Sequence, residues 1–293
     1  MAPGIRLYIA MLLALVLGWL WLRAPAIANF GRDPHWTQLL GLTSLYLSSH
    51  LFRMLRLTLL TLDQRERALP LLAAHTLTAF PSSFFPFKLG EVLRLAAFFR
   101  VYDGHRRALA VWLSERFGDV LVISGFILSL YVFNVSVPDT MRMVFLLFVL
   151  VTGLGLLSLF AVAKVSVYLN RHLVLSSHSS RGLRLLRASH TLRRLELDIL
   201  RSVEGRLSAF LLLSVLIWAV EIMALSLFVR HLAVGNPDFA GLFVSGLLAS
   251  LPGGGAAGSG AFGLYQSLAL VVLTLLSLAA FWLRIRFGSR VEK

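Results

Sequence analysis

Residues 86–94 read Pro-Phe-Lys-Leu-Gly-Glu-Val-Leu-Arg and interrupt an otherwise apolar region of the chain. A second charged run, Glu-Arg-Phe-Gly-Asp at 115–119, lies inside the next long apolar segment. Ionisable groups at membrane depth are costly, so they usually face a bundle interior or a watery cavity and mark a functional pathway. We therefore expect the functional site between Phe80 and Asp119.

The composition is that of an integral membrane protein. Of the 293 residues, 58% are hydrophobic and only 14% are charged, and the mean hydropathy is +0.80. A soluble domain has roughly 45–50% apolar residues. Each spanning helix needs roughly 20 residues, so the chain has room for one bundle of about six to eight membrane elements. We expect a single domain over residues 1–293.

The net charge of +14 does not indicate nucleic-acid binding. The basic residues lie in short loops and at helix ends, as the positive-inside rule requires, rather than in a polar domain with aromatic platforms. Cysteine is absent, which excludes disulfides, thiolate metal sites and a cysteine nucleophile.

The apolar runs predict an all-α polytopic fold with about six spanning helices. The predicted spans are 7–22, 39–62, 108–133, 142–163, 207–228 and 264–283. The first is either an uncleaved helix or a signal peptide, because Ala-Ile-Ala at 26–28 has the form of a signal-peptidase site. Basic residues near both ends predict cytoplasmic termini.

Two further segments are predicted to enter the membrane and return on the same side. Residues 69–99 have basic loops at both ends and are broken by Pro81, Pro86 and Gly90, which favours a re-entrant helical hairpin. Residues 239–260 are too short to span before a glycine-rich run, which favours a second hairpin entered from outside. The two sets of span, hairpin and span run in opposite directions, as in transporters built from inverted repeats.

A basic, leucine-bearing stretch covers residues 164–206. It is interpreted either as an amphipathic helix lying on an anionic cytoplasmic leaflet or as a solvated inner loop.

The start of the second hairpin arm is a candidate anion site. A helix that begins near Leu89 or Gly90 presents free amide groups and the positive end of its dipole, which favour phosphate. Lys88 and Arg94 would strengthen this preference. Glu91 would pair with Arg94 or bind an amine on a lipid headgroup.

Glu115 and Asp119 are four residues apart and project from one helical face, with Arg116 about a quarter-turn away. They form either a buried ion-pair network with Arg94 and Arg53 or a site that presents charge to a substrate, and the two are compatible. A metal site is the less favoured alternative, because no histidine stands at metal-ligand spacing.

Other polar residues in the spans have plainer interpretations. Arg53 and Arg56 share a face of the second span and either snorkel to the interface or face a cavity. Glu221 is expected to be paired. His50 and His75 are interpreted as bundle residues with satisfied hydrogen bonds.

The charged stretch resembles the flippase-like membrane domain of the lysylphosphatidylglycerol synthase family. Pro86, Leu-Gly-Glu at 89–91 and Arg94 reproduce its first pattern, with Lys88 where an arginine is common. Glu-Arg-x-x-Asp, its second pattern, is matched at 115–119. Family members commonly carry a glutamate after the late Gly-x-Gly, and this chain has Gly263 there.

The resemblance implies transfer of a phospholipid or lipid-linked sugar between leaflets of the bacterial inner membrane, without a cofactor. The alternative is a non-transporting protein that binds lipid and serves an envelope-pathway enzyme. No enzymatic activity is expected, because only carboxylates are available as nucleophile or base. The candidate substrate-binding residues are Arg53, Lys88, Gly90, Glu91, Arg94, Glu115, Arg116, Asp119 and Glu221.

Overall fold

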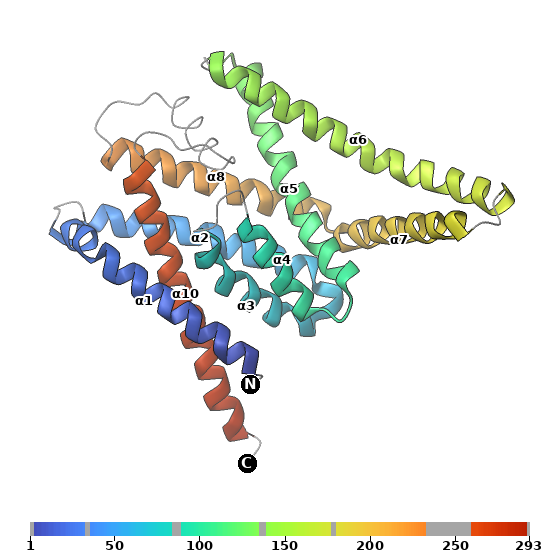
Figure 1. Cartoon of the computed structure of the whole chain (residues 1–293). Helices are drawn as coiled ribbons and strands as arrows, with labels where there is room; N and C mark the ends of the chain where they lie inside the picture. The colour runs from blue at the N-terminus through green and yellow to red at the C-terminus, as the bar shows by residue number, and fades with distance from the viewer. Residues whose placement is uncertain are drawn as a thin grey trace.

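The computed structural model describes residues 3–32, 36–83, 89–134, 139–176, 180–232 and 259–291. Within these ranges the chain is helical apart from short turns and has no strand, which confirms the all-α class for this part of the sequence. The helices are α1 (Pro3–Arg32), α2 (Trp36–Leu60), the 3-10 helix η1 (Leu62–Gln64), α3 (Arg65–Ser82), α4 (Leu89–Val101), α5 (His105–Val132), α6 (Asp139–Ser176), α7 (Ser180–Val203), α8 (Leu207–Leu232) and α10 (Ser259–Val291) (Figure 1).

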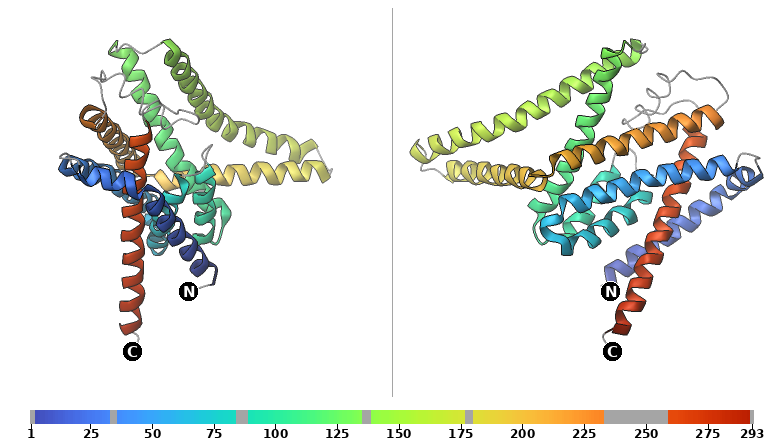
Figure 2. Two further views of the ribbon diagram at one scale, coloured as in Figure 1. Left: turned by 60° about the vertical axis from the view of Figure 1, so that its left-hand side comes forward. Right: turned by 180° about the vertical axis from the view of Figure 1, so that it is seen from behind.

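Helices α2 and α8 form the centre of the bundle. They lie side by side and antiparallel, because Arg56 contacts Ser214 whereas Ser49, two turns earlier in α2, contacts Glu221. The pair α3 and α4 packs together, α5 lies against α4 and α8, and α10 packs on α2 and α3. Helices α6 and α7 extend as an arm away from this body (Figure 2).

Three helices in the described part of the chain are long and apolar enough to cross a membrane. These segments are Gly4–Pro25 in α1, Leu207–Ala224 in α8 and Tyr265–Trp282 in α10. The other predicted spans also overlap helices. Helix α2 carries two arginines and α5 carries five charged residues. Helix α6 is 38 residues long and runs into the predicted polar stretch. A shorter apolar segment in α6 covers Phe145–Gly155.

The first predicted hairpin, residues 69–99, corresponds to two helices, α3 and α4, that pack against each other. Helix α3 includes Pro81 and ends one residue later, at Ser82, so the predicted interruption of residues 69–99 begins there. Helix α4 begins at Leu89, as predicted. Gly90 does not interrupt α4 but allows it to approach α3 closely, since a Cβ there would lie 2.5 Å from the Cβ of Ser82.

Two predicted features fall outside the described residues. Pro86 and Lys88 belong to the connection between α3 and α4. Most of the second predicted hairpin, residues 239–260, also lies outside them, and its last two residues form the start of α10.

The interior encloses charged side chains, and the surface exposes many large apolar ones. The Arg56 side chain is fully buried, whereas Trp21 on α1 is 83% exposed and Leu147 on α6 is 61% exposed. Large exposed apolar surfaces fit a lipid environment, and enclosed charges fit a bundle interior. Three apolar clusters surround these charges: one joins α1, α2 and α10, one joins α5, α6 and α8, and one joins α2, α3, α4 and α5.

Candidate functional site

Arg56 on α2 is the centre of a buried ion-pair network. Its Nη1 donates to Asp119 Oδ1 at 2.7 Å and to Ser214 Oγ at 2.9 Å, and its Nη2 lies 3.4 Å from Glu115 Oε1. The side chains of Arg56 and Glu115 have no exposed surface. One guanidinium therefore joins α2, α5 and α8 in the interior of the bundle.

Glu115 also holds the hairpin against α5. Arg94 on α4 donates from Nη2 to both carboxylate oxygens of Glu115, at 2.7 and 2.9 Å. The Arg94 side chain is only 7% exposed. Glu115 thus accepts from two arginines on different helices, which offsets the cost of burying its charge.

One edge of the network is looser and partly open. Arg116 lies 3.3 Å from Glu91 and 3.4 Å from Asp119, and the side chains of both Arg116 and Glu91 are 28% exposed. Trp112 donates from Nε1 to Glu91 at 3.2 Å. Within the described residues, Arg116 Nε and Nη2 have no hydrogen-bond acceptor, although Nη2 is in ion-pair range of Glu91. Both of these Arg116 donors are buried, and Nε of Arg56 and Nε of Arg94 likewise lack an acceptor among the described residues.

A second, partly open ion pair involves Arg53, which lies one turn before Arg56 on α2. Arg53 donates from Nη2 to Glu221 Oε1 on α8 at 2.7 Å, and Ser49 Oγ donates to the same oxygen at 3.1 Å. Trp218, one turn before Glu221, donates from Nε1 to Asp119 at 3.3 Å. This pair lies beside the Arg56 network and shares its two framework helices.

The charges of these side chains balance. The arginines are Arg53, Arg56, Arg94 and Arg116, and the carboxylates are Glu91, Glu115, Asp119 and Glu221. Balanced, hydrogen-bonded charge is the form in which ionic groups are tolerated in a low-dielectric interior. A headgroup that carries both signs of charge could exchange with such pairs without leaving a net charge behind.

Local sequence explains how the helices present these groups. Arg53 and Arg56 are one turn apart on α2, and Glu115 and Asp119 are one turn apart on α5, so each pair shares a face. Gly118 lets α8 approach that face of α5. A Cβ at Gly118 would lie 2.6 Å from Phe210 Cζ and 2.8 Å from Ser214 Oγ.

The predicted network is confirmed in part. Glu115, Asp119, Arg116 and Arg94 are joined as predicted. The predicted link from Arg53 to these carboxylates is wrong, because Arg53 pairs with Glu221 and Arg56 makes the link instead.

Two further carboxylates, Glu91 and Glu221, are also in ion pairs. Glu91 pairs with Arg116 rather than Arg94. Glu221 is paired, as predicted.

Sequence reasoning placed Arg56 on the Arg53 face but omitted it from the site. The available signal was the i, i+3 spacing of two arginines inside an apolar helix. Trp112, Trp218 and Ser214 were also missed, and the sequence offered no specific pattern for them. Their indole and hydroxyl groups satisfy the charged groups and become recognisable only when the helices are packed.

His50 and His75 differ from the prediction of satisfied bundle residues. They are 7% and 3% exposed, and their ring centroids lie 5.8 Å apart. Neither nitrogen of either ring has a hydrogen-bond partner among the described residues. The two imidazoles form a polar but unsatisfied contact between α2 and α3.

The network does not resemble a metal or nucleophile site. Among the residues that the structure describes, no group of three or more histidine, aspartate or glutamate side chains could hold a metal ion. Glu115 and Asp119 instead accept hydrogen bonds from arginine. The arrangement is suited to binding or exchanging charged groups.

Comparison of the chain with protein-family models, with curated proteins and with solved structures found no match.

Proposed function

We propose that this protein is a flippase-like or scramblase-like transporter that moves a phospholipid or lipid-linked sugar between the leaflets of the bacterial inner membrane. The observation that carries the proposal is the balanced arginine–carboxylate network enclosed by helices with exposed leucines. Such groups at membrane depth mark substrate pathways. The resemblance of residues 86–94 and 115–119 to the two patterns of the lysylphosphatidylglycerol synthase membrane domain is the sequence observation that supports this proposal.

The substrate contact in this proposal is the Glu91–Arg116 edge. These two side chains are the most exposed in the network, at 28% each. A zwitterionic headgroup would place its phosphate on Arg116 and its ammonium group on Glu91, replacing one ion pair with two. Lys88, on the adjoining connection, would add to the attraction of phosphate.

The proposed topology has six spans, two re-entrant hairpins related as an inverted repeat, and cytoplasmic termini. Helices α3 and α4 supply the first hairpin. The charged spans α2 and α5 are accommodated because their ionic groups face one another rather than lipid.

The test is leaflet exchange of fluorescent phospholipids and polyprenyl-linked lipids in liposomes that contain the purified protein. Glu91→Gln should slow exchange at least about tenfold, because one charge-assisted contact with the headgroup is lost. Asp103→Asn is the matched control, since it removes one carboxylate from the surface pair with Arg67, outside the network. Equal exchange by the wild type and Glu91→Gln would remove Glu91 from the substrate site.

One observation favours a second function, a lipid-binding accessory protein of an envelope pathway. Every arginine in the network already has a carboxylate partner, which suits a rigid scaffold as well as a moving one. Such a protein would retain lipid through purification but give no exchange with any lipid. It would also depend on a partner enzyme in the cell.

A further inference from the structure

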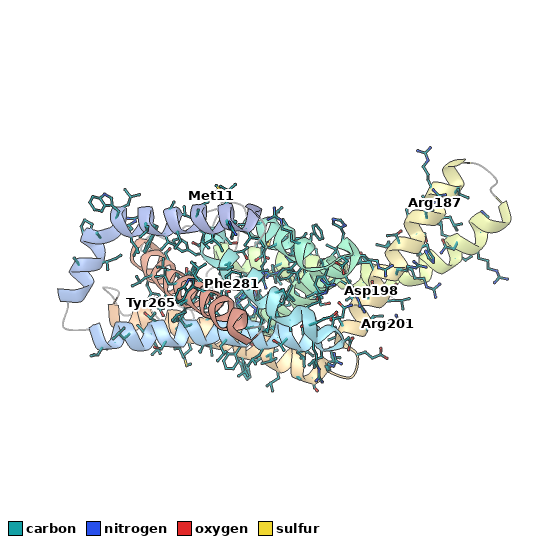
Figure 3. The ribbon with its side chains drawn as sticks, turned by 90° about the horizontal axis from the view of Figure 1, so that it is seen from below. Met11, Arg187, Asp198, Arg201, Tyr265 and Phe281 are labelled. Atoms are coloured by element: carbon teal, nitrogen blue, oxygen red, sulfur yellow. The ribbon has the colours of Figure 1, made fainter. Side chains whose placement is uncertain are left out.

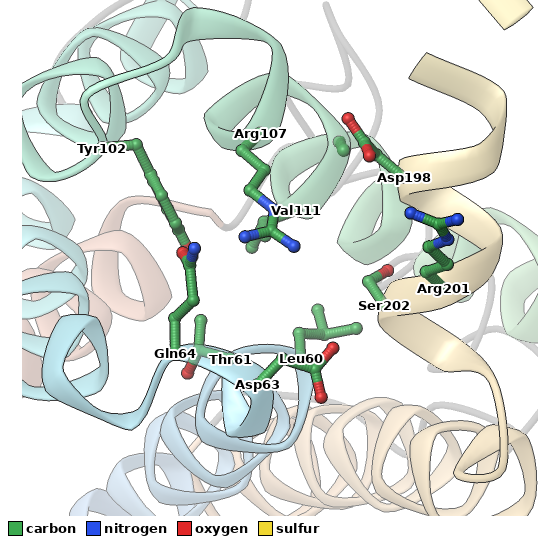
Figure 4. A pocket seen from close by; sticks show the side chains of 11 residues that line it. Leu60, Thr61, Asp63, Gln64, Tyr102, Arg107, Val111, Asp198, Arg201 and Ser202 are labelled. Carbon is green, nitrogen blue, oxygen red and sulfur yellow. The ribbon is translucent and has the colours of Figure 1, made fainter. Parts of the chain in front are cut away.

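A small polar pocket lies where the end of α2, the start of α5 and the end of α7 meet (Figure 4). Its volume is about 30 Å³, and it is partly open to the surroundings. The lining residues are Leu60, Thr61, Asp63, Gln64, Tyr102, Arg107, Ala110, Val111, Asp198, Arg201 and Ser202. The pocket is separate from the buried ion-pair network but shares α5 with it.

Two arginines in this pocket have unused donors. Arg107 extends from α5 and Arg201 from α7 (Figure 4). The neighbouring carboxylates are engaged by other arginines, because Arg206 donates to Asp63 at 2.9 Å and Arg106 donates to Asp198 at 2.6 Å. Within the described part of the chain, neither the Arg107 nor the Arg201 guanidinium has an ion-pair partner. The pocket wall itself holds two arginines and two aspartates, and each aspartate is bound by an arginine from outside the wall.

Neutral hydroxyl groups complete the pocket wall. Burial raises the pKa of the Tyr102 phenol to about 12, against the opposing effect of Arg107 and Arg67, so this group stays uncharged at neutral pH. Ser202 Oγ lies 3.0 Å from Ser114 Oγ and is held at the pocket floor. The pocket thus combines uncharged groups with two arginines that have no ion-pair partner among the described residues.

We propose that this pocket binds a phosphate group between Arg107 and Arg201. The planar guanidinium fork matches phosphate oxygens and binds them with charge-assisted hydrogen bonds. The phosphate can belong to an anionic lipid headgroup or to a soluble phosphate compound. This site does not depend on the proposed transport activity, because it uses none of the network residues.

The test measures binding rather than transport. The purified full-length protein is placed in phosphatidylcholine nanodiscs, and its thermal unfolding is followed by tryptophan fluorescence. One arm titrates inorganic phosphate against sodium chloride of equal ionic strength, and the other compares nanodiscs with and without phosphatidic acid. A ligand that binds only the folded state raises the unfolding midpoint in proportion to its occupancy.

Arg107→Gln with Arg201→Gln should weaken the apparent affinity at least about tenfold, because both charge-assisted contacts are lost. The matched control is Arg184→Gln with Arg187→Gln, which also removes two positive charges, both from α7. Arg187 lies on the part of α7 away from Asp198 and Arg201 (Figure 3). Should the first double variant fail to fold, Arg107→Lys with Arg201→Lys keeps the charge and should still lose affinity.

The proposal is supported if the ligand stabilises the wild type and the Arg184→Gln, Arg187→Gln control but not the Arg107→Gln, Arg201→Gln variant. A response to phosphatidic acid alone assigns the phosphate to a lipid, and a response to inorganic phosphate alone assigns it to a soluble compound. Absence of stabilisation by both probes, or equal stabilisation of the pocket variant, overturns the proposal.

Discussion

Arg56 is the side chain on which the interior of this molecule depends most. Replacing it with alanine leaves Glu115 and Asp119 without their shared partner in a site with almost no solvent. Removing one partner of a buried ion pair typically costs about 3–5 kcal/mol. We expect Arg56→Ala to lower the thermal unfolding midpoint sharply and to reduce the monodisperse fraction in size-exclusion chromatography.

The matched control is Arg116→Gln at the open edge of the same network. Its contacts are longer and its side chain is 28% exposed, so its removal should cost about 1 kcal/mol or less. Equal loss of stability in the two variants would show that Arg56 is not the central member of the network.

Gly118 and Gly125 on α5 offer a second comparison at the scale of single residues. A Cβ at Gly118 meets Phe210 and Ser214 below 3 Å, whereas a Cβ at Gly125 meets no atom within 4 Å. Gly118→Ala should destabilise the fold by about 1–3 kcal/mol through overpacking. Gly125→Ala should stabilise it by up to about 1 kcal/mol through helix propensity. We expect the unfolding midpoint to fall in Gly118→Ala and to rise in Gly125→Ala. Shifts in the same direction would contradict the close packing of α5 against α8.

The unsatisfied imidazoles of His50 and His75 should contribute little to stability. A buried polar group without a partner costs free energy, and an apolar group of similar shape does not carry that cost. The double variant His50→Phe with His75→Phe is expected to unfold at a midpoint equal to or above that of the wild type. A clear decrease would mean that the rings are hydrogen-bonded in the membrane, for example through bound water.

The residues of the site were largely predictable, but their pairing was not. Charge inside apolar segments identified Glu91, Arg94, Glu115 and Asp119 from the sequence alone. Which arginine reaches which carboxylate depends on how α2 and α8 are aligned along their lengths. Sequence spacing within one helix carries no information on that alignment, so the partners of Arg56 and the contact from Trp218 to Asp119 were found only in the structure.

At the scale of elements, α7 is the clearest amphipathic helix. Its exposed leucines include Leu192, and Arg194 lies two residues away, about 200° around the helix. A basic amphipathic helix of this kind binds an anionic leaflet with its apolar face. We expect the apolar face of α7 to lie in the headgroup region rather than in water.

Single-cysteine variants can test this placement without background, because the chain contains no cysteine. A fluorophore at Leu192→Cys should be quenched by spin-labelled lipids in anionic nanodiscs, and one at Arg194→Cys should be quenched much less. Equal and weak quenching at both positions would identify α7 as part of a solvated loop.

Helix positions were predicted better than the role of the breaks between them. Each predicted span overlaps one of α1, α2, α5, α6, α8 and α10 over nearly its whole length, because long apolar runs are the clearest helix signal in the sequence. Helix α3 ends one residue after Pro81, whereas Gly90 was predicted to interrupt the chain and instead lies inside α4. The apolar run at 142–163 ends well before the helix does, because α6 continues to Ser176.

At the scale of the whole molecule, the proposed topology requires α5 to cross the bilayer. The helix has 28 residues, so it is about 42 Å long at about 1.5 Å per residue. The hydrocarbon core is about 30 Å thick, and the charges in the middle of α5 are paired within the bundle. Helix α5 can therefore cross a bilayer although its composition is not that of a simple span.

We expect cysteines at Asp103 and Asn134, in the turns at the two ends of α5, to react with a membrane-impermeant maleimide from opposite sides of the membrane. Asp103→Cys should react only in inverted vesicles and Asn134→Cys only in intact spheroplasts. A cysteine at Glu204, in the turn between α7 and α8, serves as a control that should label with Asp103→Cys. Labelling of Asp103→Cys and Asn134→Cys from the same side would contradict the six-span topology, because the two sets of helices could then no longer be related by inversion across the membrane.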